Sequence, residues 1–425
     1  MTLSCAAWQV QVRFQPVREG RSAMKIIYHH RTASRDGQST HIEEMIRGLQ
    51  AAGVQVDVCA PEVGGHDPSG GSGGWVGRLK ALLPKPAYEL AEIAYSVVAY
   101  RKLLRLARQT GAQGVYERYN LYLLAGAWFK RRRGLKLILE VNSPIALERR
   151  EYGGLSLPRL ADWAEHYVWK SADVILPVTQ VLARYMVTKG VDARRIVVIP
   201  NGINLEDYAD LPSVEAAKAR LGLGGRLVVG FTGFVREWDR LDRIVKWMAA
   251  HGVQHNVHLL VIGDGPARAE IEQCAHELAV SDRLTFTGAV GRREVPALAM
   301  AFDIALQTAL VPYASPLCLF EYLALSKAIV APDQPNHHEI LTDRLDSLLY
   351  DPVDEQGIEK ALNELCANPE LRASIAASAS GVIRRKGLTW KQHAITVRDL
   401  FLGQSADSTG CASGQVVRQG RDDST

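Results

Sequence analysis

Short apolar runs alternate with amphipathic stretches along most of the chain. Parallel strands that are buried on both faces have such runs, and the helices that cover them have amphipathic patterns. We predict a first strand at residues 24–28, a helix at about residues 40–52, and a second strand at residues 54–58, with Gly53 ending the helix. The sequence therefore opens with a β–α–β unit and predicts an α/β protein with parallel sheets.

Three further apolar runs in the first half are predicted to be strands that lead into loops, at residues 135–141, 172–179 and 196–202. The first of them places Asn142 at its carboxyl end. Ligands bind at the carboxyl ends of the strands in open α/β sheets, so Asn142 is a candidate site residue. The first βα unit lacks the G-x-G-x-x-G fingerprint of dinucleotide-binding proteins, which argues against a dehydrogenase.

A second series of strands follows residues 205–225, and three of these strands close on a glycine: Gly233, Gly263 and Gly288. Glycine allows a ligand to approach the backbone closely. Tight connections between strands and helices also need glycine for purely structural reasons. The structural explanation is favoured for any one of the three, and a functional explanation for the set.

The stretch from Ser315 to Ala324 is predicted to be a loop that turns into a helix. Ser315 suits the N-cap and Pro316 the first helical position, which would leave the N–H groups of Leu317 and Cys318 facing an anion. Glu321 would lie about 9 Å farther along the helix axis. One helix could then hold a phosphate at its end and a sugar hydroxyl beyond it. The alternative is an ordinary core helix with an exposed glutamate.

Composition narrows the classes of function. With 425 residues, of which 47% are hydrophobic, the chain is large enough for two domains with separate cores. Its six cysteines show neither C-x-x-C spacing nor a neighbouring histidine cluster, which argues against a disulfide framework or a zinc site and favours a reducing cytoplasm.

The net charge of +4 is unevenly distributed, because residues 78–136 contain 13 Lys and Arg against 3 Glu and no Asp. This segment includes a predicted basic amphipathic helix at residues 88–108 and the run Lys130-Arg131-Arg132-Arg133. Such a surface suits contact with an anionic membrane, and the alternative is a solvated helix face with a charged turn. No RNA- or DNA-binding motif accompanies the charge, so nucleic acid is not an expected partner.

Residues 1–23 lack the apolar core of a signal peptide, and we expect translation to start at Met24. The predicted order is a non-native or disordered extension, an N-terminal domain, a linker, a C-terminal domain, a helix and a disordered tail. These parts correspond to residues 1–23, 24–205, 206–225, 226–385, 386–402 and 403–425, respectively.

Several motifs in the second half occur in a recognisable order, at residues 199–204, 261–266, 286–288, 315–324 and 327–330. With them the chain resembles the retaining glycosyltransferases of family 4, from about residue 24 to residue 402. The resemblance implies the GT-B fold, in which two doubly wound Rossmann-like domains with parallel sheets face each other across a cleft. It also implies that the N-terminal domain binds the acceptor, that the C-terminal domain binds a nucleotide sugar, and that the helix at residues 386–402 packs back towards the N-terminal domain.

The resemblance assigns roles to individual residues. The diphosphate of the donor would lie at the helix that begins near Ser315, and Glu321 would hold the ribose hydroxyls. Gly37 resembles the glycine loop that closes on the donor phosphates, and Asn142 lies near the position from which many relatives face the donor sugar. The remaining residues that the resemblance places around the donor are Gly233, Gly263, Asp264, Gly288, Pro316, Leu317 and Cys318.

The chain departs from the family pattern at two places. The first glutamate of the Glu-x7-Glu motif falls on Tyr313, which puts contacts to the donor hexose in doubt. The arginine and lysine that usually follow the glycine matched by Gly233 are replaced by Phe234 and Asp239. Guanidinium groups bind phosphate well, so the nearest replacements are the two arginines that follow, Arg236 and Arg240.

The resemblance implies a hexosyltransferase that moves a sugar from a UDP- or GDP-linked donor to a lipid-linked or polysaccharide acceptor, with retention of anomeric configuration. Neither a metal ion nor a separate cofactor is expected, and the expected location is the cytoplasm, with peripheral contact to the inner face of the cytoplasmic membrane. Two alternatives remain: a pseudoenzyme that binds nucleotide sugar without turnover, and a GT-B epimerase, which is less favoured because its carboxylates cannot be placed.

Overall fold

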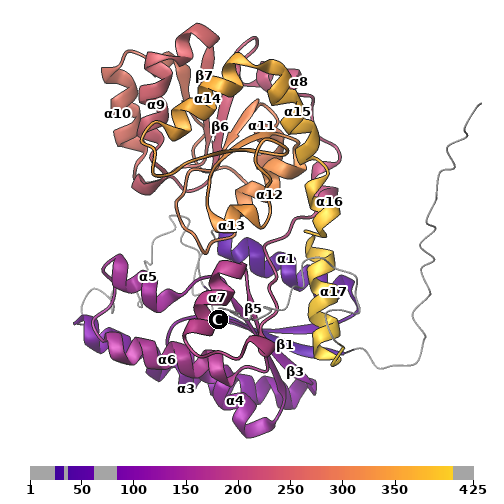
Figure 1. The fold of residues 1–425 in the computed structure, drawn as a ribbon. Coiled ribbons are helices and arrows are strands. Elements are labelled where there is room, and N and C mark those ends of the chain that lie inside the picture. Colours follow the sequence, from indigo (N-terminus) through magenta and orange to yellow (C-terminus); the bar gives the residue numbers. More distant parts are fainter. Residues whose placement is uncertain (1–23, 33–36, 62–83, 405–425) are drawn as a thin grey trace, which may run out of the picture.

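The computed structural model describes residues 24–32, 37–61 and 84–404. Two α/β domains follow one another along the chain, and the final helices return from the second domain to the first (Figure 1). The expectations for residues 1–23 and for the tail from residue 405 onwards fall outside the described residues.

The N-terminal domain is built on a five-stranded parallel sheet with the order β2-β1-β3-β4-β5. Its central strand β3 was not predicted from the sequence, because it includes the charged Glu117 and Arg118, and it is nevertheless buried along its whole length. The strands are β1 (Lys25–His29), β2 (Gln55–Cys59), β3 (Gly114–Arg118), β4 (Lys136–Val141) and β5 (Val174–Pro177).

Helices cover both faces of this sheet. One face packs against α1 and α17, and the other packs against α3, α4, α6 and α7. The helices of the domain are α1 (Gly37–Ala51), α3 (Lys85–Thr110), α4 (Ala125–Arg133), α5 (Ile145–Glu151), α6 (Pro158–Ser171) and α7 (Gln180–Thr188). None of the helices in the described ranges is both long and apolar enough to cross a membrane.

The prediction of a full strand at residues 196–202 was wrong. Only Ile196 forms a bridge, to Ile175, and the N–H groups of Val197 and Ile199 then donate to the carbonyls of Ile175 and Pro177. The segment is extended, but the neighbouring strand β5 is only four residues long and ends at Pro177, so it offers no further length for pairing.

The C-terminal domain has a six-stranded parallel sheet with the order β11-β10-β9-β6-β7-β8. The strands are β6 (Leu227–Thr232), β7 (Val257–Ile262), β8 (Leu284–Phe286), β9 (Ile304–Leu306), β10 (Ala328–Pro332) and β11 (Leu348–Tyr350). The carboxyl ends of these strands carry the loops that hold most of the candidate donor-binding residues.

This sheet separates two hydrophobic cores. One core lies under α9, α10 and α14, and the other lies under α8, α11, α12 and α16. The helices are α8 (Val214–Arg220), α9 (Leu241–Ala250), α10 (Arg268–Glu277), α11 (Val295–Ala299), α12 (Leu317–Ala324), α13 (Pro335–His338), α14 (Gly357–Ala367), α15 (Pro369–Ala379) and α16 (Val382–Lys386). Short 3₁₀ helices occur at Ala193–Arg195, Leu205–Tyr208, Glu237–Asp239, Gly252–His255 and Ser281–Arg283.

The chain crosses between the domains at two places, and these crossings are bonded to each other. The N–H of Ile203, on the outward crossing, donates to the carbonyl of Leu388 at 3.2 Å. The N–H of Trp390, on the return crossing, donates to the carbonyl of Ile203 at 3.3 Å. The helix α17 (Trp390–Phe401) begins there, capped by the hydroxyl of Thr389, and runs along α1 (Figure 1).

Two glycines allow α17 to lie this close. A Cβ atom at Gly48 of α1 would come within 3.0 Å of Ala394 and of the carbonyl of Trp390. A Cβ atom at Gly114 of β3 would come within 2.6 Å of the ring of Phe401. Absence of a side chain at these two positions therefore permits the last helix to dock on the N-terminal domain.

Candidate active site

The helix α12 begins at the junction of the two domains, next to the carboxyl end of β9 (Figure 1). The structure shifts its predicted start by one residue, because Pro316 is the N-cap and Leu317 is the first helical residue. The prediction that Ser315 caps the helix was therefore wrong. The hydroxyl of Ser315 instead accepts a hydrogen bond of 3.1 Å from the backbone N–H of Asn201, in the N-terminal domain.

The start of α12 remains suited to an anion. Leu317 and Cys318 occupy its first turn, where the backbone N–H groups of a helix lack partners within the helix. The N–H of Leu317 donates a hydrogen bond to no group within the described residues. The thiol of Cys318 donates to the side-chain oxygen of Gln307 and so turns towards the end of β9.

Glu321 lies on the same helix, just over one turn beyond Leu317. Its side chain is partly buried, and no hydrogen bond or ion pair within the described ranges engages its carboxylate. Burial raises the pKa of Glu321 to about 7, and the nearby positive charge of Arg292 opposes this rise only in part. A carboxylate that is desolvated and has no partner is free to accept hydrogen bonds from a ligand.

Arg292 follows β8 and links this region to the N-terminal domain. Its guanidinium lies 2.8 Å from the carboxylate of Glu44 on α1, which is almost completely buried. Sequence reasoning missed Arg292 because the residue lies outside every motif that was singled out. The sequence feature that could have indicated Arg292 is its position four residues after Gly288, which closes a predicted strand.

The three strand-closing glycines have different causes. A Cβ atom at Gly263 would lie 1.9 Å from the carbonyl oxygen of Gly233, so Gly263 is required by the packing of one loop on the other. A Cβ atom at Gly233 would touch only the ring of Phe231, at 3.4 Å, and one at Gly288 would meet nothing closer than 3.9 Å. Backbone packing therefore explains Gly263, and positive φ angles of 155° and 70° favour glycine at Gly233 and Gly288, respectively.

Asp264 has a local role in the structure. One oxygen of its carboxylate accepts the N–H of Gly265 at 2.8 Å, and the other lies 3.4 Å from the guanidinium of Arg268. The side chain is partly exposed. These contacts shape the loop after β7. The contact of Asp264 with the donor stays a prediction.

The two candidate replacement cations occupy different settings. Arg236 is exposed, and its guanidinium lies 5.2 Å from the ring centroid of Phe234 and 4.9 Å from that of Trp238. Arg240 has a left-handed backbone with φ of 50° at the start of α9 and lies 3.5 Å from the carboxylate of Asp242. In the described chain neither guanidinium makes a hydrogen bond or ion pair to α12.

Asp239, which stands where the family has a lysine, turns inward. Its carboxylate accepts the backbone N–H of Arg236 at 2.9 Å, and burial raises its pKa despite this hydrogen bond. The side chain therefore shapes the loop between β6 and α9 and does not supply charge to a ligand.

Tyr313, which stands at the first position of the Glu-x7-Glu motif, reaches across to the N-terminal domain. Its hydroxyl donates to the carboxylate of Glu148 on α5 at 3.0 Å, and its backbone carbonyl accepts from the hydroxyl of Thr179, also at 3.0 Å. The hydroxyl of Ser143 donates to the other oxygen of Glu148 at 3.0 Å. A carboxylate from the other domain thus lies beside the position where the motif has lost one.

Asn142 is only partly exposed, and its amide donates to the carboxylate of Glu140 on β4. Glu140 also accepts from the hydroxyl of Tyr116 at 2.7 Å, contacts Arg118, and lies 3.0 Å from Nε2 of His41. Burial alone would raise the pKa of Glu140, but His41 and Arg118 hold it well below its usual range. The one sequence signal for Glu140 was a charged residue within an apolar strand.

Gly37 was expected in a loop ahead of a helix starting near residue 40, and this expectation was wrong. The helix α1 already begins at Gly37. The preceding residues 33–36 lie outside the described residues, so the glycine loop that the resemblance implies is not placed.

The domains also meet at the start of α7. The carboxylate of Glu339, which follows α13 in the C-terminal domain, accepts the backbone N–H groups of Gln180 and Val181 at 2.8 and 3.2 Å. A side chain of one domain therefore caps a helix of the other.

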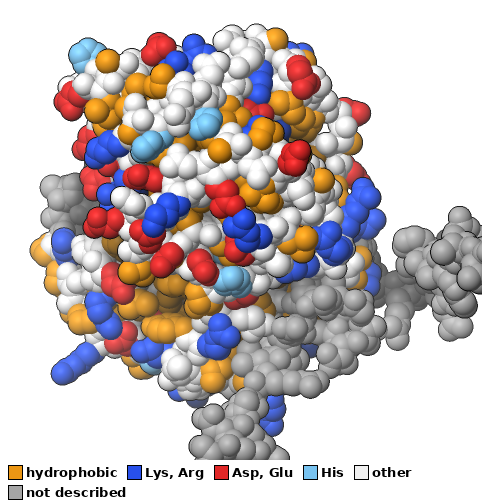
Figure 2. Space-filling model, turned by 45° about the horizontal axis from the view of Figure 1, so that its top comes forward, with side chains coloured by type: hydrophobic (Ala, Val, Ile, Leu, Met, Phe, Trp, Pro, Cys, Tyr) orange, Lys and Arg blue, Asp and Glu red, His pale blue; other side chains and the backbone are white. Residues whose placement is uncertain are grey.

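On the surface, acidic and basic side chains are intermixed over the face of the molecule shown in Figure 2.

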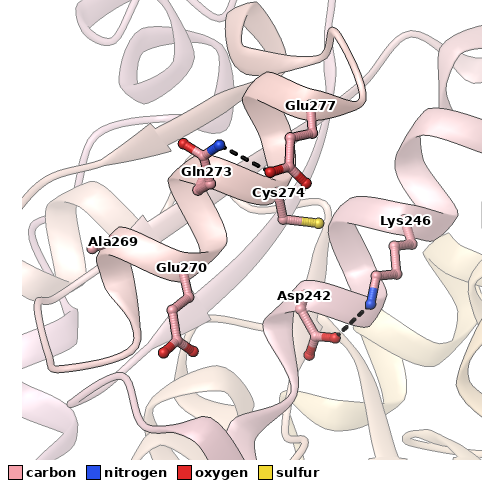
Figure 3. A pocket seen from close by; sticks show the side chains of 7 residues that line it. All are labelled: Asp242, Lys246, Ala269, Glu270, Gln273, Cys274 and Glu277. Atoms are coloured by element: carbon pink, nitrogen blue, oxygen red, sulfur yellow. Dashed lines mark hydrogen bonds and ion pairs between the residues drawn. The ribbon is translucent and has the colours of Figure 1, made fainter.

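A groove elsewhere on the C-terminal domain is not part of this site. It lies between α9, which contributes Asp242 and Lys246, and α10, which contributes Glu270, Cys274 and others (Figure 3). These two helices cover the opposite face of the sheet from α12. Asp242 and Lys246 also pair with each other at 3.0 Å, so the charge of each is already balanced.

Comparison with known proteins shows which family this chain belongs to. Residues 36–202 match the model of the glycosyl transferase 4-like domain, and residues 213–381 match that of the glycosyl transferases group 1. The chain belongs to the GT4-like glycosyltransferases. The two models together cover both sheets, so the family resemblance seen in the motifs is confirmed.

Two curated relatives illustrate the range of the family. The chain is 31% identical over 149 residues to the 2-deoxystreptamine glucosyltransferase of Streptomyces kanamyceticus, a match that covers 33% of this chain and 38% of that protein. It is 27% identical over 250 residues to the lipopolysaccharide core biosynthesis glycosyltransferase LpsD of Rhizobium meliloti, covering 58% and 68%, respectively. The chain thus spans little more than a third of the first relative and about two thirds of the second.

Solved structures confirm the GT-B fold of this glycosyltransferase. Anabaena Alr3699/HepE, in complex with UDP and glucose, superposes with a TM-score of 0.68 at 17% identity and covers 89% of this chain and 99% of its own. The sucrose-phosphate synthase of Thermosynechococcus elongatus gives a TM-score of 0.70 at 16% identity and covers 89% and 98%, respectively. Two parallel α/β domains in this arrangement are what the sequence predicted.

Replacing Glu321 by glutamine should weaken donor binding in a pH-dependent way. The resemblance implies that ribose hydroxyls would donate hydrogen bonds to the ionised carboxylate. A pKa near 7 means that most of the free protein has this carboxylate protonated at pH 6 and ionised at pH 8. Donor affinity of the unaltered protein should therefore rise by up to about tenfold between these pH values. In Glu321→Gln it should be weaker at pH 8 and nearly independent of pH. Calorimetric titration measures both.

The same variant should remain folded. Burial raises the pKa of Glu321 in the folded state above its ordinary value of 4.5, so ionisation destabilises the fold as pH rises from about 4.5 to 7. The melting temperature of Glu321→Gln at pH 8 should thus be no lower than that of the parent. Equal donor affinity for the two proteins at pH 8 would contradict the assignment of Glu321.

Proposed function

We propose that this glycosyltransferase moves a hexose from a UDP- or GDP-linked donor to a lipid-linked or polysaccharide acceptor, with retention of configuration and without a metal ion. The observation that carries the donor part is Glu321, a desolvated carboxylate without a partner on the helix whose first N–H groups face the domain junction. The names of HepE, bound to UDP, and of LpsD, in lipopolysaccharide core biosynthesis, support the donor and acceptor classes, respectively.

The reaction requires little chemistry beyond charge stabilisation and positioning. The bond between the anomeric carbon and the diphosphate oxygen breaks, the acceptor hydroxyl oxygen bonds to the same carbon, and the hydroxyl proton passes to the departing diphosphate. Negative charge accumulates on the diphosphate, where the N–H groups of Leu317 and Cys318 and the dipole of α12 stabilise it. The N-terminal domain positions the acceptor hydroxyl.

A panel of UDP-, GDP- and ADP-sugars tests the proposal directly. We expect the protein to hydrolyse or transfer from at least one UDP- or GDP-sugar, and the product to have the anomeric configuration of the donor. Activity should persist in a chelating agent. Binding of a nucleotide sugar without turnover, with a range of glycan acceptors supplied, would favour the pseudoenzyme instead. Its specific support is the replacement of three motif residues by Phe234, Asp239 and Tyr313.

Arg240 is the proposed cation for the leaving diphosphate, because it stands one residue after the usual lysine position. Its pairing partner Asp242 lies at 3.5 Å, and more than half of the arginine side chain is exposed, so the guanidinium is available to a ligand. We expect Arg240→Ala to lower kcat about 100-fold, with little change in affinity for the free nucleoside, which carries no phosphate.

Arg236→Ala is the matched control. Arg236 is held between two aromatic rings, so its removal should have a smaller effect on kcat than removal of Arg240. If both single variants and the double variant keep full activity, no arginine after Gly233 has the leaving-group role, and the start of α12 carries it alone.

We also propose that the basic side of the N-terminal domain contacts an anionic membrane, which would place the protein at the inner face of the cytoplasmic membrane. The side chains of Arg131, Arg132 and Arg133 are exposed at the end of α4, which packs on α3. The exposed residues of α3 include Arg101 and the apolar Val98. Exposed basic and apolar groups on neighbouring helices suit the headgroup region.

The protein should sediment with anionic vesicles and be released by salt, since electrostatic attraction near a surface is screened within about 8–10 Å at physiological ionic strength. The triple variant R131A/R132A/R133A should sediment markedly less. A triple substitution of Arg243, Arg372 and Arg384 by alanine, on the C-terminal domain, provides a control of equal charge. Equal sedimentation with neutral and anionic vesicles would refute the contact.

A further inference from the structure

A chain of polar contacts connects the interior of the N-terminal sheet to the start of α12. Its first member is Glu140 on β4, whose carboxylate lies 3.0 Å from Nε2 of His41. The other ring nitrogen of His41, Nδ1, lies 2.8 Å from the side-chain oxygen of Asn201. Asn201 in turn donates its backbone N–H to the hydroxyl of Ser315, and its side-chain amide to the carbonyl of Ser315.

The donors and acceptors in this chain are fixed by their partners. The carbonyl of Ser315 can only accept, so the amide nitrogen of Asn201 faces it and the amide oxygen faces His41. Nδ1 of His41 must then carry a hydrogen. Nε2 lies 3.0 Å from the carboxylate of Glu140. His41 is thus almost completely buried between the side chains of Asn201 and Glu140.

The groups around His41 agree with this arrangement. Arg118, the amide of Asn142 and the hydroxyl of Tyr116 also contact Glu140, and Arg118 and Asn142 help to hold its pKa well below the usual range. The ring of Trp390 on α17 packs edge-on against His41, with 4.7 Å between ring centroids. His393, also on α17, is fully buried, and burial together with the charge of His41 lowers its pKa to about 3, so it is neutral.

We propose that His41 is a positioning residue, which holds the side chain of Asn201 in the one orientation that fixes Ser315, and with it the start of α12, against the N-terminal domain. Ser315 directly precedes the N-cap of α12, so a displacement of Ser315 relative to Asn201 moves the proposed diphosphate site relative to the acceptor domain. Nucleotide binding depends mainly on the C-terminal domain, whereas transfer depends on the alignment of both domains. Loss of His41 should therefore reduce turnover more than it reduces nucleotide affinity.

The effect on turnover rests on the proposed transfer reaction, but the effect on Ser315 does not. The backbone N–H of Asn201 is bonded to Ser315, so its hydrogen exchange reports the contact directly, without substrate. We expect His41→Leu to lower the protection of this amide at least tenfold. We also expect it to lower kcat by about 10-fold, as for loss of one positioning hydrogen bond, with Kd for UDP and GDP changed less than twofold.

Two further variants separate positioning from a general loss of stability. The amide of His41→Gln can still donate to Asn201, so this variant should retain most of the protection and most of kcat. The matched control is His393→Leu, which removes a buried histidine from the same helix contact. No hydrogen bond within the described residues engages the side chain of His393, so protection and kcat should stay at the parent values.

If His41→Leu does not fold, Asn201→Asp is the second test. This variant removes the amide donor to the carbonyl of Ser315 and leaves His41 in place. It should show the same loss of protection and turnover. Parental protection of the Asn201 amide in both His41→Leu and Asn201→Asp would overturn the proposal. An equal loss in His393→Leu would also overturn it. If the parent protein shows no turnover with any sugar nucleotide, the proposed function fails, while hydrogen exchange still decides the role of His41.

Discussion

The arrangement of the two domains depends on a small number of polar contacts between loops that leave the carboxyl ends of the strands. Ser315 contacts Asn201, Tyr313 contacts Glu148, and Glu339 caps the start of α7. A hydrogen bond contributes only about 0.5–1.5 kcal/mol of net stability, whereas each domain has its own extensive hydrophobic core. Two residues of the C-terminal domain, Leu317 and Tyr313, also pack against the cores of the N-terminal domain, so the junction combines polar contacts with apolar packing.

The sequence was most informative about features that depend on neighbouring residues. Strands buried on both faces require continuous apolar runs, and the order of strands and helices could be predicted from them. Two of the three wrong expectations about local structure have local causes. A proline after Ser315 moved the helix cap by one residue, and the short β5 left residues 196–202 without enough of a partner strand.

The polar chain through Glu140, His41 and Asn201 could not be predicted in the same way. Its members are separated by between 60 and 160 residues, and only Glu140, a charged residue within an apolar strand, stands out in its own segment. His41 alone is a polar residue on an amphipathic helix, and Asn201 alone is part of a loop. Only the parallel sheet order, which places β4 between β3 and β5, brings these side chains together. The need for glycine at Gly263 could not be predicted from its own segment either. The atom that excludes a side chain there is the carbonyl oxygen of Gly233, which lies on a different loop.

The paired crossings at Ile203 and Trp390 have a consequence for how the domains can move. Two separate connections at distant points would hold the domains at a fixed angle, and a single connection would let one domain swing in any direction. Here the two connections lie side by side and are bonded to each other, so they act as one short double-stranded strip. Such a strip resists stretching and shear but allows bending and twist. A change in the angle between the two domains would therefore take place by rotation about this strip.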